Sequence, residues 1–188
     1  MLNRTMSVIA LALVVAIGFP PAAAYAAGSY RSRIEQYVKA RPQQARTTFL
    51  AMQKAGWGYK TAAQKNRAYA ALRVAAGESG MNPVNDRNKS CSGLFQIQGG
   101  KKAYGKWTAR ELSNPRVLAK YTLGEDRRLF GPLRSGGKGY YTKHVVYYKP
   151  RVGEYKIFNP VFNAEIALRM HTARGWKPWT VARKLGYR

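Results

Sequence analysis

The chain has 188 residues, enough for one domain with a hydrophobic core once a targeting segment is removed. A formal net charge of +25, spread among aromatic and aliphatic residues, indicates a folded basic surface and a polyanionic partner. The single cysteine, Cys91, excludes an intramolecular disulfide, and with no Cys/His cluster we expect neither a metal nor an organic cofactor.

Residues 1–26 have the pattern of a signal peptide. Arg4 supplies a positive charge, an apolar stretch runs from Val8 to Phe19, and Ala24-Tyr25-Ala26 offers a cleavage site between small residues. The alternative is a retained membrane anchor, which the glycine and prolines that interrupt this short stretch disfavour. We therefore expect a protein that is exported to the periplasm, the cell wall or the medium.

Export changes which polyanion is expected as the partner. Nucleic acid is the usual partner of so basic a chain, but outside the cytoplasmic membrane anionic cell-wall polymers and peptidoglycan are at hand. We therefore favour cell-wall polymers over nucleic acid, and we expect a monomer.

Two helical stretches follow between residues 27 and 60. Pro42 separates a short first helix from a longer second one, and Gly56-Trp57-Gly58 ends the second. We interpret 27–60 as an N-terminal helical segment that packs on a domain formed by residues 61–188.

The strongest helix pattern runs from Thr61 to Gly77. Thr61 can cap its start, and alanines, which have the highest helix propensity, fill its interior. Glu78 follows at the end, on the face that carries Ala71, Val74 and Ala75. A carboxyl group among small apolar side chains has a raised pKa, which is what a catalytic acid needs. The alternative is a solvated glutamate at a helix end.

Residues 81–98 read as loops and a short hairpin, with turn-forming residues followed by an apolar run. Asn85-Asp86 is one of the turn formers, and Gly93-Leu94-Phe95-Gln96-Ile97 restores apolar character. The arrangement predicts one acid, Glu78, that faces a turn rich in amides, with Asp86 as the nearest candidate for a second carboxylate.

Residues 99–158 form a basic stretch rich in glycine and tyrosine, which we interpret as an insertion. Residues 145–148 and 154–158, separated by Pro150 to Gly153, predict a hairpin. The chain then returns to a helix. Asn159 can cap it, Pro160 suits its first position, and Gly175 is the expected stop.

Two of these stretches carry a family resemblance. Glu78-Ser79 followed by Gly93 to Ile97 resembles the signature of lysozyme-like lytic transglycosylases, which reads Glu-Ser and then Gly-Leu-Met/Phe-Gln-Ile. Asn159 to Ala164 and Gly175 to Trp179 resemble the closing helix of the same superfamily in bacterial and phage proteins. The Ala-Tyr-Asn-x-Gly segment of many soluble-type members is absent from the sequence. The resemblance implies an α+β, mainly α, lysozyme-like fold with a small β/loop subregion.

The resemblance also implies a reaction, cleavage of the β-1,4 bond between N-acetylmuramic acid and N-acetylglucosamine in peptidoglycan. Glu78 would protonate the leaving oxygen and then accept the proton of the muramic acid 6-hydroxyl, which gives a 1,6-anhydro end without water. Ser79 would contact a sugar acetamido group or orient Glu78, and Gln96 would contact the substrate. Tyr147 and Tyr148 offer ring faces on which sugars can stack.

Two other functions remain open. A lysozyme-type hydrolase uses two carboxylates, and Asp86 would be the second. The chain has only eight acidic residues, which favours the single-acid route of a lytic transglycosylase. The third possibility is a basic protein without enzyme activity that binds cell-wall polyanions or nucleic acid. It accounts for the charge but leaves the ordered motifs as coincidence.

Overall fold

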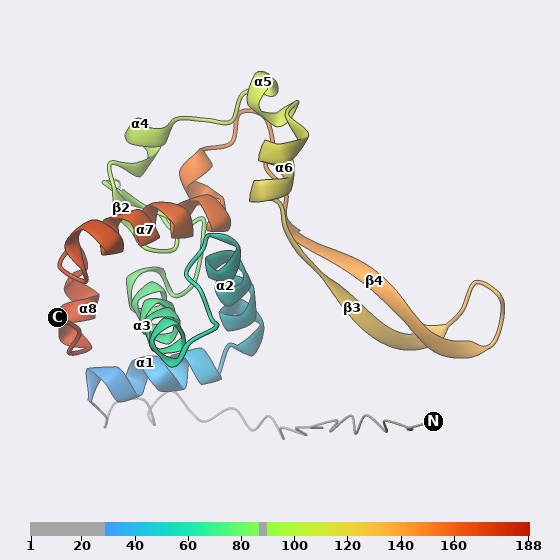
Figure 1. Cartoon of the computed structure of the whole chain (residues 1–188), viewed down its shortest axis with the longest axis horizontal. Coiled ribbons are helices and arrows are strands. Elements are labelled where there is room, and N and C mark those ends of the chain that lie inside the picture. The colour runs from blue at the N-terminus through green and yellow to red at the C-terminus, as the bar shows by residue number, and fades with distance from the viewer. Residues whose placement is uncertain (1–28, 87–89) are drawn as a thin grey trace, which may run out of the picture.

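The structure is a computed structural model that describes residues 29–86 and 90–188 (Figure 1). The expected signal peptide lies outside the described residues. Within the described ranges, no helix is both long and apolar enough to cross a membrane. The fold is α+β and mainly α, as predicted. In chain order its elements are α1 (Tyr30–Lys39), α2 (Pro42–Lys54), α3 (Ala62–Ser79), β1 (Cys91–Ser92), β2 (Ile97–Gln98), α4 (Gly100–Tyr104), α5 (Ala109–Leu112), α6 (Pro115–Tyr121), β3 (Leu123–Pro132), β4 (Lys138–Tyr148), η2 (Lys156–Phe158), α7 (Pro160–Arg174) and α8 (Thr180–Lys184).

The central helix is α3, which contacts α1, α2 and α8 (Figure 1). Thr61 and Gln64 form a capping box at its start, which confirms the predicted beginning. The helix ends at Ser79 and not at Gly77, because Gly80 takes the left-handed conformation (φ 66°) that stops it. Gly77 has a packing role instead, since a Cβ there would lie 2.5 Å from the Val181 side chain.

The N-terminal helices belong to the same core as the rest of the described chain. Met52 of α2 is fully buried, and α2 packs against α7. Trp57, also fully buried, donates a hydrogen bond from its indole Nε1 to the carbonyl of Ala164 (2.9 Å). Residues 29–60 therefore pack on the following residues, and the boundary at residue 60 is not a boundary between two cores.

Helix α7 forms as predicted. The Asn159 side chain accepts hydrogen bonds from the backbone N–H groups of Val161 and Phe162, Pro160 occupies the first turn, and the helix ends before Gly175. After it, Trp179 is buried and donates from Nε1 to the carbonyl of Phe95 (3.0 Å). The C-terminal part of the chain thus closes over the turn that follows β1.

The predicted hairpin is wrong. Residues 145–148 are the end of the long strand β4, which pairs antiparallel with β3, and Lys156–Phe158 is a 3-10 helix. The turn lies at Leu133–Gly137, where Gly136 and Gly137 have positive φ (89° and 77°). The sequence predicts the turn at Pro150 to Gly153, and the structure has it at Leu133–Gly137. We call residues 123–148 the arm, since this two-stranded ribbon projects from the helices (Figure 1), and the other described residues the body.

Candidate functional site

Glu78 lies in the last turn of α3, and its half-buried side chain faces the start of α8. Burial is the largest influence on its pKa and raises it. The backbone N–H of Val181, which lies close to the carboxyl group, and the charge of Lys184 act in the opposite direction and do not cancel the effect. The residues predicted to share its face, Ala71, Val74 and Ala75, are all fully buried. The carboxyl group therefore keeps its proton to a higher pH than an ordinary glutamate.

The same geometry gives Glu78 a structural role. The N-cap residue of α8, Trp179, makes no side-chain cap, and Val181 stands in the first turn of that helix. A carboxylate close to Val181 N–H can serve as an acceptor for one of the free N–H groups of a helix start. Sequence reasoning missed this contact, because Val181 has no polar side chain to mark it.

The side chain of Ser79 points back into its own helix. Its hydroxyl donates to the carbonyl of Ala75 (3.1 Å), one turn earlier, and only 7% of the residue is exposed. Its own carbonyl accepts a hydrogen bond from Asn85 Nδ2 (3.0 Å). Ser79 thus joins the helix end to the following loop.

Gln96 holds the turn together. Its side-chain Nε2 donates to the carbonyls of Asn85 (3.1 Å) and Gly93 (2.9 Å), and its φ of 48° is unusual for a residue other than glycine. Backbone strain of this kind is often found at functional sites. The amide nitrogen expected to reach substrate is thus engaged within the loop.

Asn163 of α7 fixes the same turn from the other side. Fully buried, it accepts from the N–H of Phe95 (3.0 Å) and donates to the carbonyls of Ser92 (3.1 Å) and Ile157 (3.0 Å). A Cβ on Gly93 would lie 2.1 Å from the Asn163 amide nitrogen, so glycine is required there. We predicted no role for Asn163. The available signal was an amide among the apolar residues of the last helix.

Asp86 is bound within the loop. Lys101 forms an ion pair with one carboxylate oxygen, and the Ser92 hydroxyl donates to the other (3.3 Å). Only 29% of its side chain is exposed. The charge of this predicted second carboxylate is therefore balanced by a neighbouring cation.

A cavity of about 560 Å³ is lined by Ser79, the residue after Glu78 in the sequence, and it brings together three of the predicted site residues, Ser79, Tyr147 and Tyr148. Glu78, Asp86 and Gln96 are not among its lining residues. Helices α1 and α2 supply a wall that we did not predict, although Gln43 and Thr47 are four residues apart in a helix and so share a face. The full lining is Tyr37, Gln43, Gln44, Thr47, Thr48, Ser79, Gly80, Met81, Asn82, Pro83, Asn85, Leu94, Tyr147, Tyr148 and Pro160.

The two tyrosines stand where the arm joins the body. The Tyr147 hydroxyl donates to Glu125 (2.5 Å) and also contacts Arg127, while Arg46 of α2 pairs with the other oxygen of Glu125 (2.8 Å). Tyr147, Arg127 and Arg46 lower the pKa of Glu125 to about 2. Tyr148 is half-buried, and burial raises the pKa of its hydroxyl. The arm is thus anchored to α2 beside the cavity.

Comparison of the chain with protein-family models, curated proteins and solved structures finds no match. Among the residues that the structure describes, no group of three or more His, Cys, Asp or Glu side chains could hold a metal ion. Two features of the described residues therefore bear on function, the buried environment of Glu78 and the cavity lined by Ser79.

Proposed function

We propose that the protein cleaves the glycan strands of peptidoglycan at the β-1,4 bond between N-acetylmuramic acid and N-acetylglucosamine, with Glu78 as the general acid. One observation carries this proposal. Burial raises the pKa of Glu78, whereas hydrogen bonds from neighbouring side chains lower those of Glu111, Glu125 and Glu165. A group that must donate a proton near neutral pH needs the first kind of environment.

The surrounding elements support a lysozyme-like arrangement. A buried helix ends at the acid, a small two-stranded sheet follows, and a closing helix fixes the intervening turn through Asn163. The cavity that begins at Ser79 has the size of a small-molecule site, and tyrosine rings stand on its wall. We place a sugar unit next to the cleaved bond in this cavity, against Tyr147 and Tyr148.

We further propose the lytic route. Glu78 donates its proton to the leaving O4 as the bond from C1 to O4 breaks. The carboxylate then accepts the proton of the muramic acid 6-hydroxyl as O6 bonds to C1, so the acid is regenerated and no water is consumed. The pairing of Asp86 with Lys101 and Ser92 supports this route over hydrolysis, because a second carboxylate that is already neutralised is poorly suited to activate water.

The test is Glu78→Gln, assayed on purified peptidoglycan by zymogram and by mass analysis of the released muropeptides. Glutamine keeps an oxygen that can accept from Val181 N–H, so the cap on α8 remains, but it cannot donate the catalytic proton. We expect a loss of roughly 10²–10⁴-fold in cleavage with an unchanged circular dichroism spectrum. Glu35→Gln is the matched control, because Glu35 pairs with Arg31 and Arg73 on the surface of α1.

A folded Glu78→Gln variant that keeps more than about a tenth of the activity would contradict the assignment. Reducing ends in place of 1,6-anhydro ends would replace the lytic route by a lysozyme-type hydrolase.

The contact between Glu78 and Val181 favours a second candidate. If the carboxyl group serves only as the cap of α8, the protein is a basic binder of cell-wall polyanions without enzyme activity. No clearing by either the parent or Glu78→Gln on the zymogram supports this binder.

A further inference from the structure

One face of the arm is exposed along its whole length. Side chains alternate between the two faces of a ribbon, and the register pairs Arg128 with Thr142 and Phe130 with Tyr140. Every even-numbered residue from 126 to 132 and from 138 to 146 is exposed. No described part of the body covers this face.

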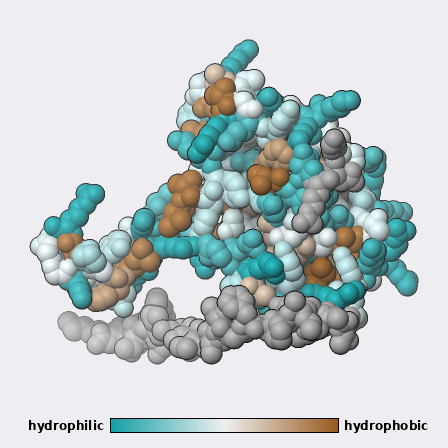
Figure 2. Space-filling view, turned by 180° about the vertical axis from the view of Figure 1, so that it is seen from behind, coloured by the Kyte–Doolittle hydropathy of each residue, from teal (hydrophilic) through white to brown (hydrophobic). Residues whose placement is uncertain are grey.

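The exposed face carries apolar side chains that the pairing of the two strands does not require. Phe130 is 62% exposed and Tyr140 is 64% exposed, and their rings contact each other with centroids 5.1 Å apart. Pro132 is exposed and Leu133 is half-exposed just beyond them. Figure 2 shows apolar patches along the arm between hydrophilic ones. Exposed apolar residues therefore lie near the free end, and Val146 is exposed at the base of the arm as well (49%).

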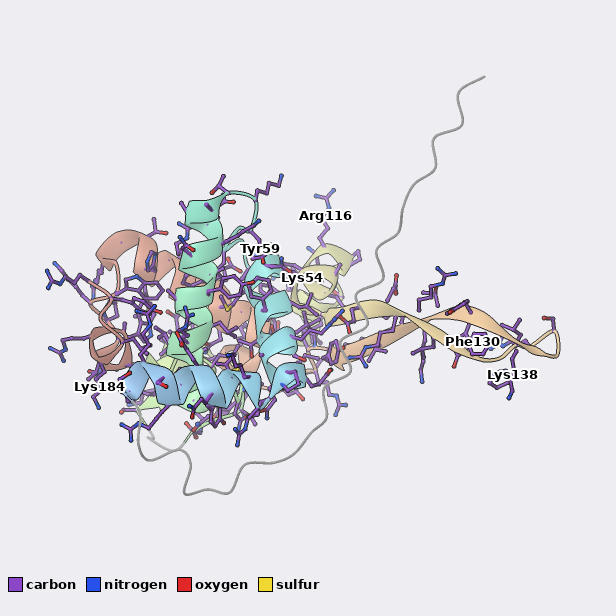
Figure 3. All side chains as sticks on the ribbon, turned by 90° about the horizontal axis from the view of Figure 1, so that it is seen from below. Lys54, Tyr59, Arg116, Phe130, Lys138 and Lys184 are labelled. Atoms are coloured by element: carbon purple, nitrogen blue, oxygen red, sulfur yellow. The ribbon has the colours of Figure 1, made fainter. Side chains whose placement is uncertain are left out.

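The same end is purely cationic. Between residues 127 and 143 the sequence contains no acidic residue, and the Arg128 guanidinium lies 4.5 Å from the centroid of the Tyr140 ring. Figure 3 shows Phe130 and Lys138 far out on the arm, whereas Arg116 lies on the body. Of the five cations in this stretch, Arg127 pairs with Glu125 at the base of the arm, and the other four are Arg128, Arg134, Lys138 and Lys143.

We propose that the distal arm, residues 127–143, binds the surface of a bilayer that contains anionic lipids. Phe130, Pro132 and Leu133 would enter the boundary between headgroups and acyl chains, and the surrounding cations would contact lipid phosphates. A hydrophilic polyanion would satisfy the charges but would offer no apolar phase for Phe130 and Leu133. The projection of the arm lets its end reach a membrane while the body stays in water (Figure 1). This inference is independent of the proposed glycan cleavage.

The first experiment is vesicle flotation of the full chain and its variants. Phe130→Ser combined with Tyr140→Ser should weaken binding to mixed phosphatidylcholine and phosphatidylglycerol vesicles by roughly tenfold or more, because two apolar side chains no longer enter the interface. The control is Val152→Ser combined with Tyr69→Ser, which removes exposed apolar groups of the body (63% and 43% exposed). It should bind like the parent.

Charge is tested in the same assay. Arg128→Gln with Lys138→Gln should weaken binding to the anionic vesicles by roughly 25-fold, at about fivefold per cation, and leave binding to pure phosphatidylcholine unchanged. Arg116→Gln with Lys177→Gln is the matched control, since both residues are exposed on the body. Any binding through residues 1–28 is common to all variants, so only differences between them count.

Insertion is tested with Phe130→Trp and, as its control, Val152→Trp. Brominated acyl chains should quench the fluorescence of the first tryptophan and not of the second. Equal vesicle binding by the arm variants and the parent would overturn the proposal. So would binding to soluble polyphosphate without quenching by brominated lipid, which would assign the arm to a hydrophilic polyanion. Glu78→Gln should float like the parent, so this test can fail while the proposed function stands.

Discussion

The body buries Trp57, Phe95 and Trp179 against one another, whereas the arm leaves the rings of Phe130 and Tyr140 in solvent. In the body, ring centroids lie 5.8 Å apart for Trp57 and Phe95 and 6.1 Å apart for Phe95 and Trp179. The arm depends instead on strand pairing and on the ion pairs of Glu125 at its base. Burial stabilises the body, so we expect substitutions there to change folding and substitutions in the distal arm to change binding.

The largest effect on stability should come from a substitution of Asn163 in the body. Asn163→Ala removes three hydrogen bonds from a fully buried position and leaves the N–H of Phe95 and two carbonyls without this partner. At about 1–3 kcal/mol for each unsatisfied group, we expect a loss of roughly 3 kcal/mol or more in the free energy of unfolding. Urea denaturation followed by tryptophan fluorescence measures it.

Asn114→Ala is the control for this prediction. Asn114 caps α6 at the surface by accepting from the Arg116 N–H (2.9 Å), so its loss should cost only about 1 kcal/mol. Equal costs at the two positions would show that the turn after β1 does not depend on α7.

A salt series separates binding by the exposed cations from cleavage at the candidate site around Glu78. Binding to intact cell walls should weaken steeply with ionic strength, because exposed cations act over a screening length of about 10 Å at 0.1 M salt. On the proposed function, cleavage of a short soluble glycan should change far less, since the carboxyl group of Glu78 is partly desolvated. Wall pelleting and oligomer turnover are measured across the same series. Parallel loss of both would place the cations in the active site itself.

The junction of body and arm should respond to acid. The pKa of Glu125 in the folded protein, about 2, lies below its unfolded value of about 4.3. Its stabilising contribution is therefore complete above the unfolded value and is lost as the pH falls toward about 2. NMR signals of Tyr147 and Arg127 in the folded protein should shift as the pH approaches about 2. In Glu125→Gln the shift should disappear, and its persistence would assign the transition to another acid.

The smallest effect should be that of Asp86→Asn. The variant loses an ion pair with Lys101, which is partly exposed and worth no more than about 1 kcal/mol. On the lytic route, cleavage and the yield of 1,6-anhydro ends should stay close to those of the parent. Loss of most of the rate, measured by muropeptide mass analysis, would make Asp86 the second carboxylate of a hydrolase.

The sequence allowed the two main helices of the body to be predicted because their signals are local. Thr61 and Asn159 mark the starts of α3 and α7 by side-chain caps that need no distant partner. The arm was missed because Val145 to Tyr148 looks like a strand in either hairpin, and only pairing with Leu123–Glu125 decides which one forms. Strand pairing over more than 20 residues leaves no trace in local propensity.

The candidate site was predictable to a similar extent. Apolar spacing in α3 predicted a raised pKa for Glu78, and burial raises it in the structure. The partners of Glu78, Asp86 and Gln96 were not predictable, since Val181, Lys101 and Asn85 become neighbours only when the chain folds. The residue types at the site could be predicted from the sequence. The contacts that each side chain makes could not, because they depend on the tertiary structure.

The hydrogen bonds that enclose the turn after β1 come from late in the chain. Asn163 lies 68 residues after Phe95, and Trp179 lies 84 residues after it. Closing such long loops costs chain entropy that is recovered only when the final contacts form. A chain emerging from the ribosome or a translocation pore would have to expose its last helices before this turn is fixed. On the proposed function, the order of synthesis itself keeps an incomplete chain inactive.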